Sequence, residues 1–173
     1  MSDKEFDLNT HTARLLLDEP FFAAISRRID KRASNAIPTA GVMVNPDTAQ
    51  FEMLYNPKFF EDLTDLNRTD VLKHEFYHIL FEHVTGRKPA DGLKRIDNIA
   101  MDLAINGLPE LQGKLPCEKD PGPMMPSGEY LKGCLPGEGP FEDLPAGKTY
   151  EWYLQELERM QEEHEQEQGE QGQ

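Results

Sequence analysis

The sequence predicts an α+β fold that is mainly helical, with a small β-hairpin beside a central helix. Three observations lead to this prediction. Several segments repeat apolar residues at helical spacing, residues 40–55 alternate as a pair of strands does, and this pair leads into a helical segment at residues 70–86. At 173 residues, the chain is long enough for one domain with a sizeable core.

Composition narrows the classes of partner. The formal net charge of −14 argues against nucleic acid or an anionic membrane as the main partner. Residues 1–9 lack the apolar segment of a secretory signal, and no apolar run approaches the length of a membrane span. Cys117 and Cys134 lie far apart, so a reduced, cytoplasmic location is expected, with one disulfide or a weak metal clip as the alternative.

The N-terminal segment is predicted to contain two helices. Residues 1–9 are expected to be a flexible leader, and a globular domain is expected over residues 10–157. The helical pattern begins at Thr10, and Pro20 is expected in the first turn of the second helix. The apolar face of that second helix comprises Phe21, Phe22, Ile25 and Ile29. Its other face carries a basic run that is expected to be solvated, with partner binding as the alternative: Arg27, Arg28, Lys31 and Arg32.

Residues 40–55 are predicted to form a β-hairpin. The segments 40–44 and 51–55 have the composition of strands, and the residues between them favour a turn, with Pro46 preset for its second position. Asn56 and Pro57 then predict a short helical turn that leads into the central helix.

Residues 70–86 are predicted to form the helix around which the chain is organised. Thr69 is a good N-cap, Asp70 places an acid in the first turn, and Gly86 offers a C-terminal stop. An apolar stripe of Leu72, Phe76, Ile79 and Leu80, together with His83, is expected to face the core.

This helix contains an H-E-x-x-H motif, formed by His74, Glu75 and His78. Because positions i and i+4 share one face of a helix, both imidazoles can bind one metal ion. Glu75 can then accept a proton from the metal-activated water. The alternative is that the two histidines are stacked on the helix by chance.

A zinc site of this kind needs a third protein ligand. His83 lies nine residues after His74, as the third histidine does in the H-E-x-x-H-x-x-G-x-x-H arrangement. On a continuous helix, however, His83 would point roughly 140° away from His78. His83 is therefore predicted to be a core or rim histidine on the side of the helix opposite the ligands.

Asp102 is the second candidate. Residues 94–106 predict a helix on which Asn98, Asp102 and Asn106 stack in one polar stripe on an otherwise apolar surface. A buried polar stripe requires partners, which a metal ion and histidine N–H groups would supply. Asp102 is therefore predicted to be the third ligand, with Asn98, Asn106 or Asp97 hydrogen-bonded around it. The alternative is a solvated helix face.

Residues 107–147 are predicted to form a Pro/Gly-rich loop that could wall an active-site cleft. Its candidate apolar contacts are Met124, Met125, Tyr130 and Phe141, and Tyr130 could also stabilise an oxyanion.

Thr149 is expected to cap a last helix whose Tyr150 and Tyr153 face the core. Residues 158–173 are predicted to be an acidic Glu/Gln-rich tail in which the helix frays, and His164 in this tail is assigned no function.

Four runs of sequence carry a resemblance to a known family: GVMVNP, FEMLYNPKFF, LKHEFYHILFEH and IDNIAMDLAIN. Together they resemble the zincin-like metallopeptidase domain of the VWA-like predicted metal-dependent peptidases. The resemblance covers residues 40–106 most clearly. It implies a zincin-like fold with a small sheet beside the H-E-x-x-H helix, a zinc cofactor and a protein or peptide substrate.

The resemblance also bears on partners and on the substrate. In this family a VWA-like domain usually follows, so the chain is expected either to stand alone or to be a fragment, with a VWA-like domain or partner protein outside it. In zinc peptidases a strand beside the active helix offers its edge to an extended substrate. Residues 40–55 are expected to do so here, with plain structural packing as the alternative.

Taken together, the residues predict a zinc-dependent peptidase. His74, His78 and Asp102 are expected to bind Zn²⁺, and Glu75 is expected to act as the general base when water attacks the peptide bond. The alternative is a non-catalytic metal-binding or assembly module that keeps the fold. The retained carboxylate of Glu75 favours the enzyme. A third hypothesis, a protease for DNA-bound proteins, is disfavoured by the charge of −14.

Overall fold

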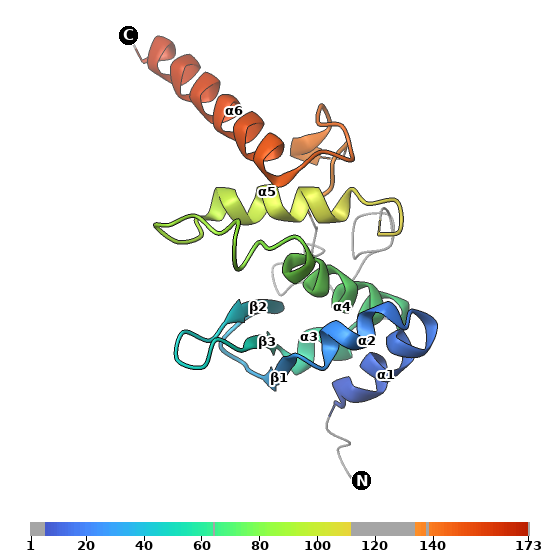
Figure 1. Cartoon of the computed structure of the whole chain (residues 1–173). Coiled ribbons are helices and arrows are strands. Elements are labelled where there is room, and N and C mark those ends of the chain that lie inside the picture. Colours follow the sequence, from blue (N-terminus) through green and yellow to red (C-terminus); the bar gives the residue numbers. More distant parts are fainter. Residues whose placement is uncertain (1–5, 64, 112–133, 138, 173) are drawn as a thin grey trace. The chain divides into compact units, whose positions relative to one another are not determined.

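The structure is a computed structural model that describes residues 6–63, 65–111, 134–137 and 139–172. These residues contain six α-helices and a three-stranded β-sheet (Figure 1). The predicted mainly helical α+β class with a small sheet is therefore confirmed. The described residues divide into two compact units, one within residues 6–88 and the other formed by residues 89–111 and 134–172.

The first unit begins with two short helices, α1 (Leu8–Asp18) and α2 (Phe21–Ser26). The side chain of Asp7 caps α1 by accepting a hydrogen bond from the backbone N–H of Asn9 at 3.0 Å. Leu8 is buried, so both the helix and the core start before the predicted position at Thr10.

The prediction of helix at Ile29 is wrong, because Ile29–Ala33 forms strand β1. This strand pairs in parallel with β3 (Phe51–Tyr55), in a register that sets Ile29 opposite Phe51 and Ala33 opposite Tyr55. Pairing with a strand distant in the sequence overrides the local helical periodicity. The basic run is consequently divided between the residues after α2 and an edge strand.

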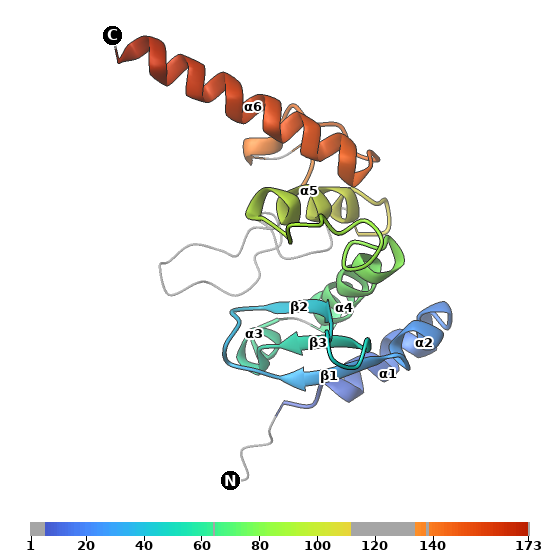
Figure 2. The same ribbon diagram turned by 60° about the vertical axis from the view of Figure 1, so that its left-hand side comes forward.

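The predicted β-hairpin is confirmed, since β2 (Ala40–Val44) pairs antiparallel with β3. The strand order is β1-β3-β2, and Figure 2 shows β3 in the middle. In the connecting turn, the side chain of Asn45 accepts hydrogen bonds from the backbone N–H groups of Asp47 at 2.9 Å and Thr48 at 3.2 Å. The turn therefore has the side-chain chemistry expected from its sequence.

Two helices follow the sheet, α3 (Pro57–Glu61) and α4 (Asp65–Leu80). Asn56 caps α3, and the start of this helix agrees with the predicted short helical turn. The helix α4 begins before the predicted N-cap at Thr69, whose hydroxyl instead donates to the carbonyl of Asp65 at 3.5 Å. It also ends at Leu80, well before Gly86. The core of this unit includes Phe22, Met53, Phe60, Leu72 and Phe76.

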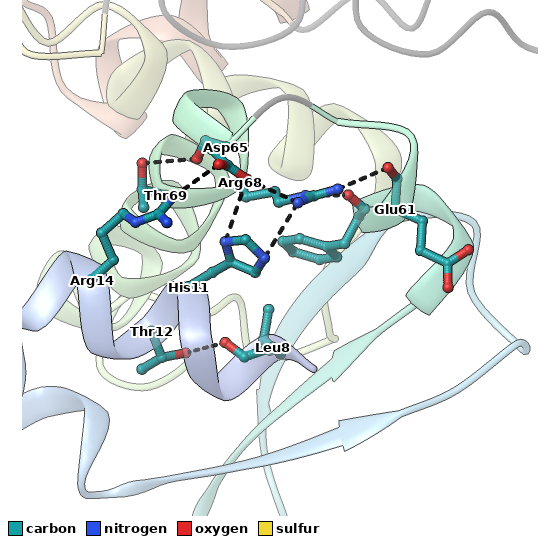
Figure 3. Close-up of polar contacts among 9 residues, drawn as sticks. Leu8, His11, Thr12, Arg14, Glu61, Asp65, Arg68 and Thr69 are labelled. Atoms are coloured by element: carbon teal, nitrogen blue, oxygen red, sulfur yellow. Dashed lines mark hydrogen bonds and ion pairs between the residues drawn. The ribbon is translucent and has the colours of Figure 1, made fainter. Parts of the chain in front are cut away.

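Arg68 joins the start of α4 to α1 and α3 (Figure 3). Its guanidinium donates to the carbonyls of Phe60 at 2.7 Å and Glu61 at 2.8 Å, and to the carboxylate of Asp65 at 3.0 Å. It also lies 3.3 Å from Nε2 of His11. Because a guanidinium can only donate, this Nε2 must accept, and His11 is neutral with its proton on Nδ1. Burial, followed by the charge of Arg68, lowers the pKa of His11 below its usual value.

We therefore expect the stability of the protein to fall in mild acid. In the unfolded chain, His11 binds a proton as the pH falls through about 6.5, whereas in the folded protein it binds one only at a lower pH. Protonation therefore favours the unfolded state as the pH falls below about 6.5. A His11→Gln variant can still accept from Arg68 but does not titrate. Between pH 8 and pH 5, urea denaturation should show a larger loss of unfolding free energy for the wild type than for His11→Gln. Equal losses would contradict this account.

The second unit contains α5 (Arg95–Asn106), a short 3₁₀ turn (Gly139–Phe141) and α6 (Tyr150–Gln171). The predicted helix at 94–106 is confirmed, as is the N-cap at Thr149, which accepts from the N–H of Trp152. The core of the second unit combines residues from α5 and α6 with Leu144 from the segment between these helices. The residues of the two helices are Ala100, Met101, Leu103, Ala104, Tyr150 and Tyr153.

The last helix continues to Gln171, whereas the sequence predicts that it frays after residue 157. Glu and Gln are good helix formers, and ion pairs of Arg159 with Glu156 and Glu163 support this part of α6.

Within the described ranges, none of the helices combines the length and apolarity needed to cross a membrane. The predicted loop residues Met124, Met125 and Tyr130, and also Cys117, lie outside the described residues, whereas Phe141 packs against the second core.

Candidate metal centre

His74 and His78 lie one turn apart on α4, with their rings directed toward each other. Their Nε2 atoms are 3.1 Å apart, and the ring planes meet at 80°. Two nitrogens that bind zinc at 2.0–2.1 Å with tetrahedral angles lie about 3.3 Å apart. The spacing of these two nitrogens therefore fits ligation of one metal ion.

The opposite face of α4 fixes the direction in which these histidines point. Leu72 and Phe76 are fully buried in the core of the first unit. The ammonium of Lys73 is also buried, 2.8 Å from the carboxylate of Glu19 and above the ring of Phe22. Rotation of α4 about its axis would expose these apolar side chains and break this ion pair. The helix is therefore held with its two histidines on one defined side.

Glu75 is buried, with 6% of its surface exposed. It follows His74 directly, about 100° further around the helix. A buried carboxylate is costly unless polar groups surround it, so its environment differs from that of the solvated glutamates of α6. The structure thus places a sheltered carboxylate next to the first histidine of the pair in sequence.

The C-terminal end of α4 is a Schellman motif. Glu82 adopts a left-handed conformation with φ of 58°, its N–H bonds to the carbonyl of Ile79 at 3.0 Å, and the N–H of His83 bonds to the carbonyl of His78 at 2.9 Å. In this motif, the residue after the left-handed position packs against the residue five positions earlier. Here these two residues are His83 and His78.

The predicted position of His83 on the opposite side of the helix is therefore wrong. The prediction assumed that the helix continues through residue 83, whereas α4 ends at Leu80 and the chain turns back. Nδ1 of His83 lies 3.1 Å from Nδ1 of His78. Of the core and rim positions that the sequence allows, His83 takes the core position, since its side chain is 0% exposed.

We expect Glu82→Gly to stabilise the protein. A left-handed conformation costs a residue with a side chain about 1–2 kcal/mol, whereas glycine adopts it readily but loses more backbone entropy on folding. The net gain in unfolding free energy should be up to about 1 kcal/mol, measured by urea denaturation.

The control for this prediction is Glu82→Ala, which removes the same carboxylate but keeps the backbone strain. Glu82→Gly should be more stable than Glu82→Ala. If alanine proves equal or better, the cap is not strained at this position.

The other predicted ligand, Asp102, lies half-buried on α5 in the second unit. The polar residues around it differ in their roles. Asp97 accepts from the hydroxyl of Tyr150 and from the backbone N–H of Lys94, both at 2.9 Å, while Asn106 donates to the carbonyl of Cys134 at 2.8 Å. These two side chains thus join parts of the second unit, and Asn98 is exposed. The polar stripe is therefore not one uniform buried surface.

Cys134 is half-buried near the same helix. Burial raises the pKa of its thiol to about 11, and the negative charge of Asp102 adds to this effect. The thiol is consequently neutral at physiological pH. The assignment of Asp102 as a metal ligand rests on the chemistry of its side chain and stays a prediction.

Comparison with known families identifies the chain at a general level. The model of a family described as "Putative metallopeptidase domain" matches residues 3–173. The chain belongs to this family. Membership of this metallopeptidase family supports peptidase activity and implies a metal cofactor. No curated protein and no solved structure gave a match.

Proposed function

We propose that this member of the metallopeptidase family is a zinc-dependent peptidase of the H-E-x-x-H type with a zincin-like fold. The observation that carries the proposal is the pair of Nε2 atoms of His74 and His78, 3.1 Å apart on a helix whose opposite face is buried. Family membership supplies the independent support, because it implies both a metal and a peptidase reaction.

The proposed ligands are His74 and His78 on α4 and Asp102 on α5. Two imidazoles and one carboxylate are donors that zinc accepts in catalytic sites, where three protein ligands leave one position open. Calcium and magnesium prefer oxygen ligands only, so this donor set favours zinc or a similar transition metal.

Glu75 is proposed to move the proton. A bound zinc ion would supply Lewis acidity, which acidifies water and polarises a scissile carbonyl. Glu75 would accept a proton as the water attacks that carbonyl and then deliver it to the leaving amine. Its burial would keep the carboxylate from competing contacts with bulk water.

The proposed substrate is an extended segment of a protein or peptide. In the described sheet, β2 is an edge strand that pairs with β3 on one side, and it packs against α4. An edge strand can bind an extended peptide through backbone hydrogen bonds. A peptide added beside β2 would therefore lie near the helix that carries His74 and His78.

The metal proposal predicts about one zinc ion per chain in protein purified without chelator. His74→Ala and His78→Ala should each lose most of this zinc, since two ligands hold the ion poorly. Asp102→Ala should also weaken zinc binding strongly, because it removes the charged ligand. Metal analysis of the dialysed proteins tests all three variants.

Two matched controls come from the same chain. His164→Ala changes an exposed histidine of α6, and Asn98→Ala changes an exposed residue one turn before Asp102 on α5. Both should retain zinc. If Asp102→Ala also retains zinc, the third ligand lies elsewhere, and if the histidine variants retain it, the proposed site is wrong.

The base proposal predicts that Glu75→Gln retains zinc and the fold but loses hydrolysis of a peptide library. The amide has nearly the same shape but cannot accept a proton, so the rate should fall at least about 10²-fold. Zinc content and circular dichroism serve as controls. A wild-type protein that binds zinc but cleaves nothing would instead support a non-catalytic metal-binding or assembly module.

A further inference from the structure

We propose that His83 is a positioning residue that fixes the orientation and tautomer of His78. His83 would hold the His78 ring so that Nε2 of His78, which faces His74 and the metal position, is unprotonated and carries a lone pair. This inference rests on the proposed function, because it takes His78 to be a metal ligand.

The contact between the two rings carries the inference. Nδ1 of His78 and Nδ1 of His83 are 3.1 Å apart, which is hydrogen-bond distance. Between two neutral imidazoles, one nitrogen must donate and the other accept. If Nδ1 of His78 donates, its Nε2 is unprotonated, as a metal ligand requires. His83 then accepts at Nδ1 and carries its own proton on Nε2.

The backbone holds His83 in this place independently of its ring. The N–H of His83 bonds to the carbonyl of His78, so residue 83 contacts residue 78 through main chain and side chain. The ring of Phe81 packs against His83 with centroids 5.7 Å apart, and Phe81 in turn packs against Tyr77. The position of the acceptor is therefore determined by the Schellman motif and by ring packing.

Burial gives the hydrogen bond its specificity. His83 is fully buried, so bulk water does not compete for Nδ1 of His78 on that side. In a Schellman motif, the residues at these two positions usually make an apolar contact. An imidazole at this place costs more desolvation than an aliphatic side chain would, which is consistent with a role in hydrogen bonding.

The same geometry separates His83 from the ligands. His78 presents Nε2 to His74 and Nδ1 to His83, and these two nitrogens lie on different edges of the ring. An ion held between the Nε2 atoms of His74 and His78 would therefore lie away from His83. Partners that orient a metal-ligating histidine in this way typically change metal affinity or activity by about 10–100-fold when removed.

The test uses two variants of the full chain. His83→Asn places a carbonyl oxygen close to the position of Nδ1 and keeps an acceptor, whereas His83→Leu fills the space without one. Zinc affinity is measured by competition with a chromophoric chelator, and the cobalt-loaded proteins are compared by visible absorption. We expect His83→Leu to bind zinc about 10–100-fold more weakly and to show a changed cobalt spectrum. His83→Asn should recover most of the affinity.

A second measurement does not depend on metal binding. In metal-free wild type at pH 8, the ¹⁵N shifts of the His78 ring should show the proton on Nδ1, and His83→Leu should shift this tautomer balance. If wild type binds no zinc, the proposed function fails, while the ¹⁵N measurement on the metal-free protein still tests the contact between His78 and His83.

Three results would overturn the inference. Wild-type affinity in His83→Leu would show that the contact has no effect on the metal. Equal weakening in the Leu and Asn variants would indicate a packing role only. Complete loss of zinc in both variants, matching that in His78→Ala, would make His83 a ligand itself.

Discussion

Burial of one side of α4 is the constraint on which the candidate site depends. Leu72 and Phe76 occupy the core of the first unit, and Lys73 extends the same buried side through its ion pair with Glu19. Because a helix is rigid about its axis, fixing one side fixes the other. His74 and His78 therefore lie on one side of α4, and no contact between these two histidines is needed to hold the helix in this orientation. At the start of α4, Arg68 adds a second anchor through the carbonyls that precede the helix.

Local chemistry determined which parts of this arrangement could be predicted from the sequence. The H-E-x-x-H spacing, the turn at Asn45 and the caps at Asn56 and Thr149 each depend on residues within a few positions of one another. Such features follow from side-chain and backbone chemistry alone. The helix at 94–106 could be predicted in the same way, since its apolar periodicity is regular.

The errors arose where a distant or unusual interaction decides the structure. Ile29 continues the helical spacing of Phe22 and Ile25, yet it pairs with Phe51, and no local signal at residue 29 reports a partner 22 positions later. The end of α4 is a different case. Glu82 adopts a conformation that favours glycine, while the glycine that the sequence offers as a stop, Gly86, lies four residues further on. A rule that looks for glycine therefore places the helix end too late.

The position of this helix end has a chemical consequence. On a continuous helix His83 would point away from His78, but the spacing of the histidines does not show where the helix ends. The spacing alone therefore cannot distinguish a ligand from a core residue. The Schellman motif changes the geometry by reversing the chain, and it brings residue 83 to the Nδ1 edge of His78 rather than to the Nε2 edge. Two backbone hydrogen bonds at the end of α4 thus decide which edge of the His78 ring a third histidine can reach. The cap of this helix consequently belongs to the candidate site, because it sets the surroundings of His78, and is not only the end of a secondary-structure element.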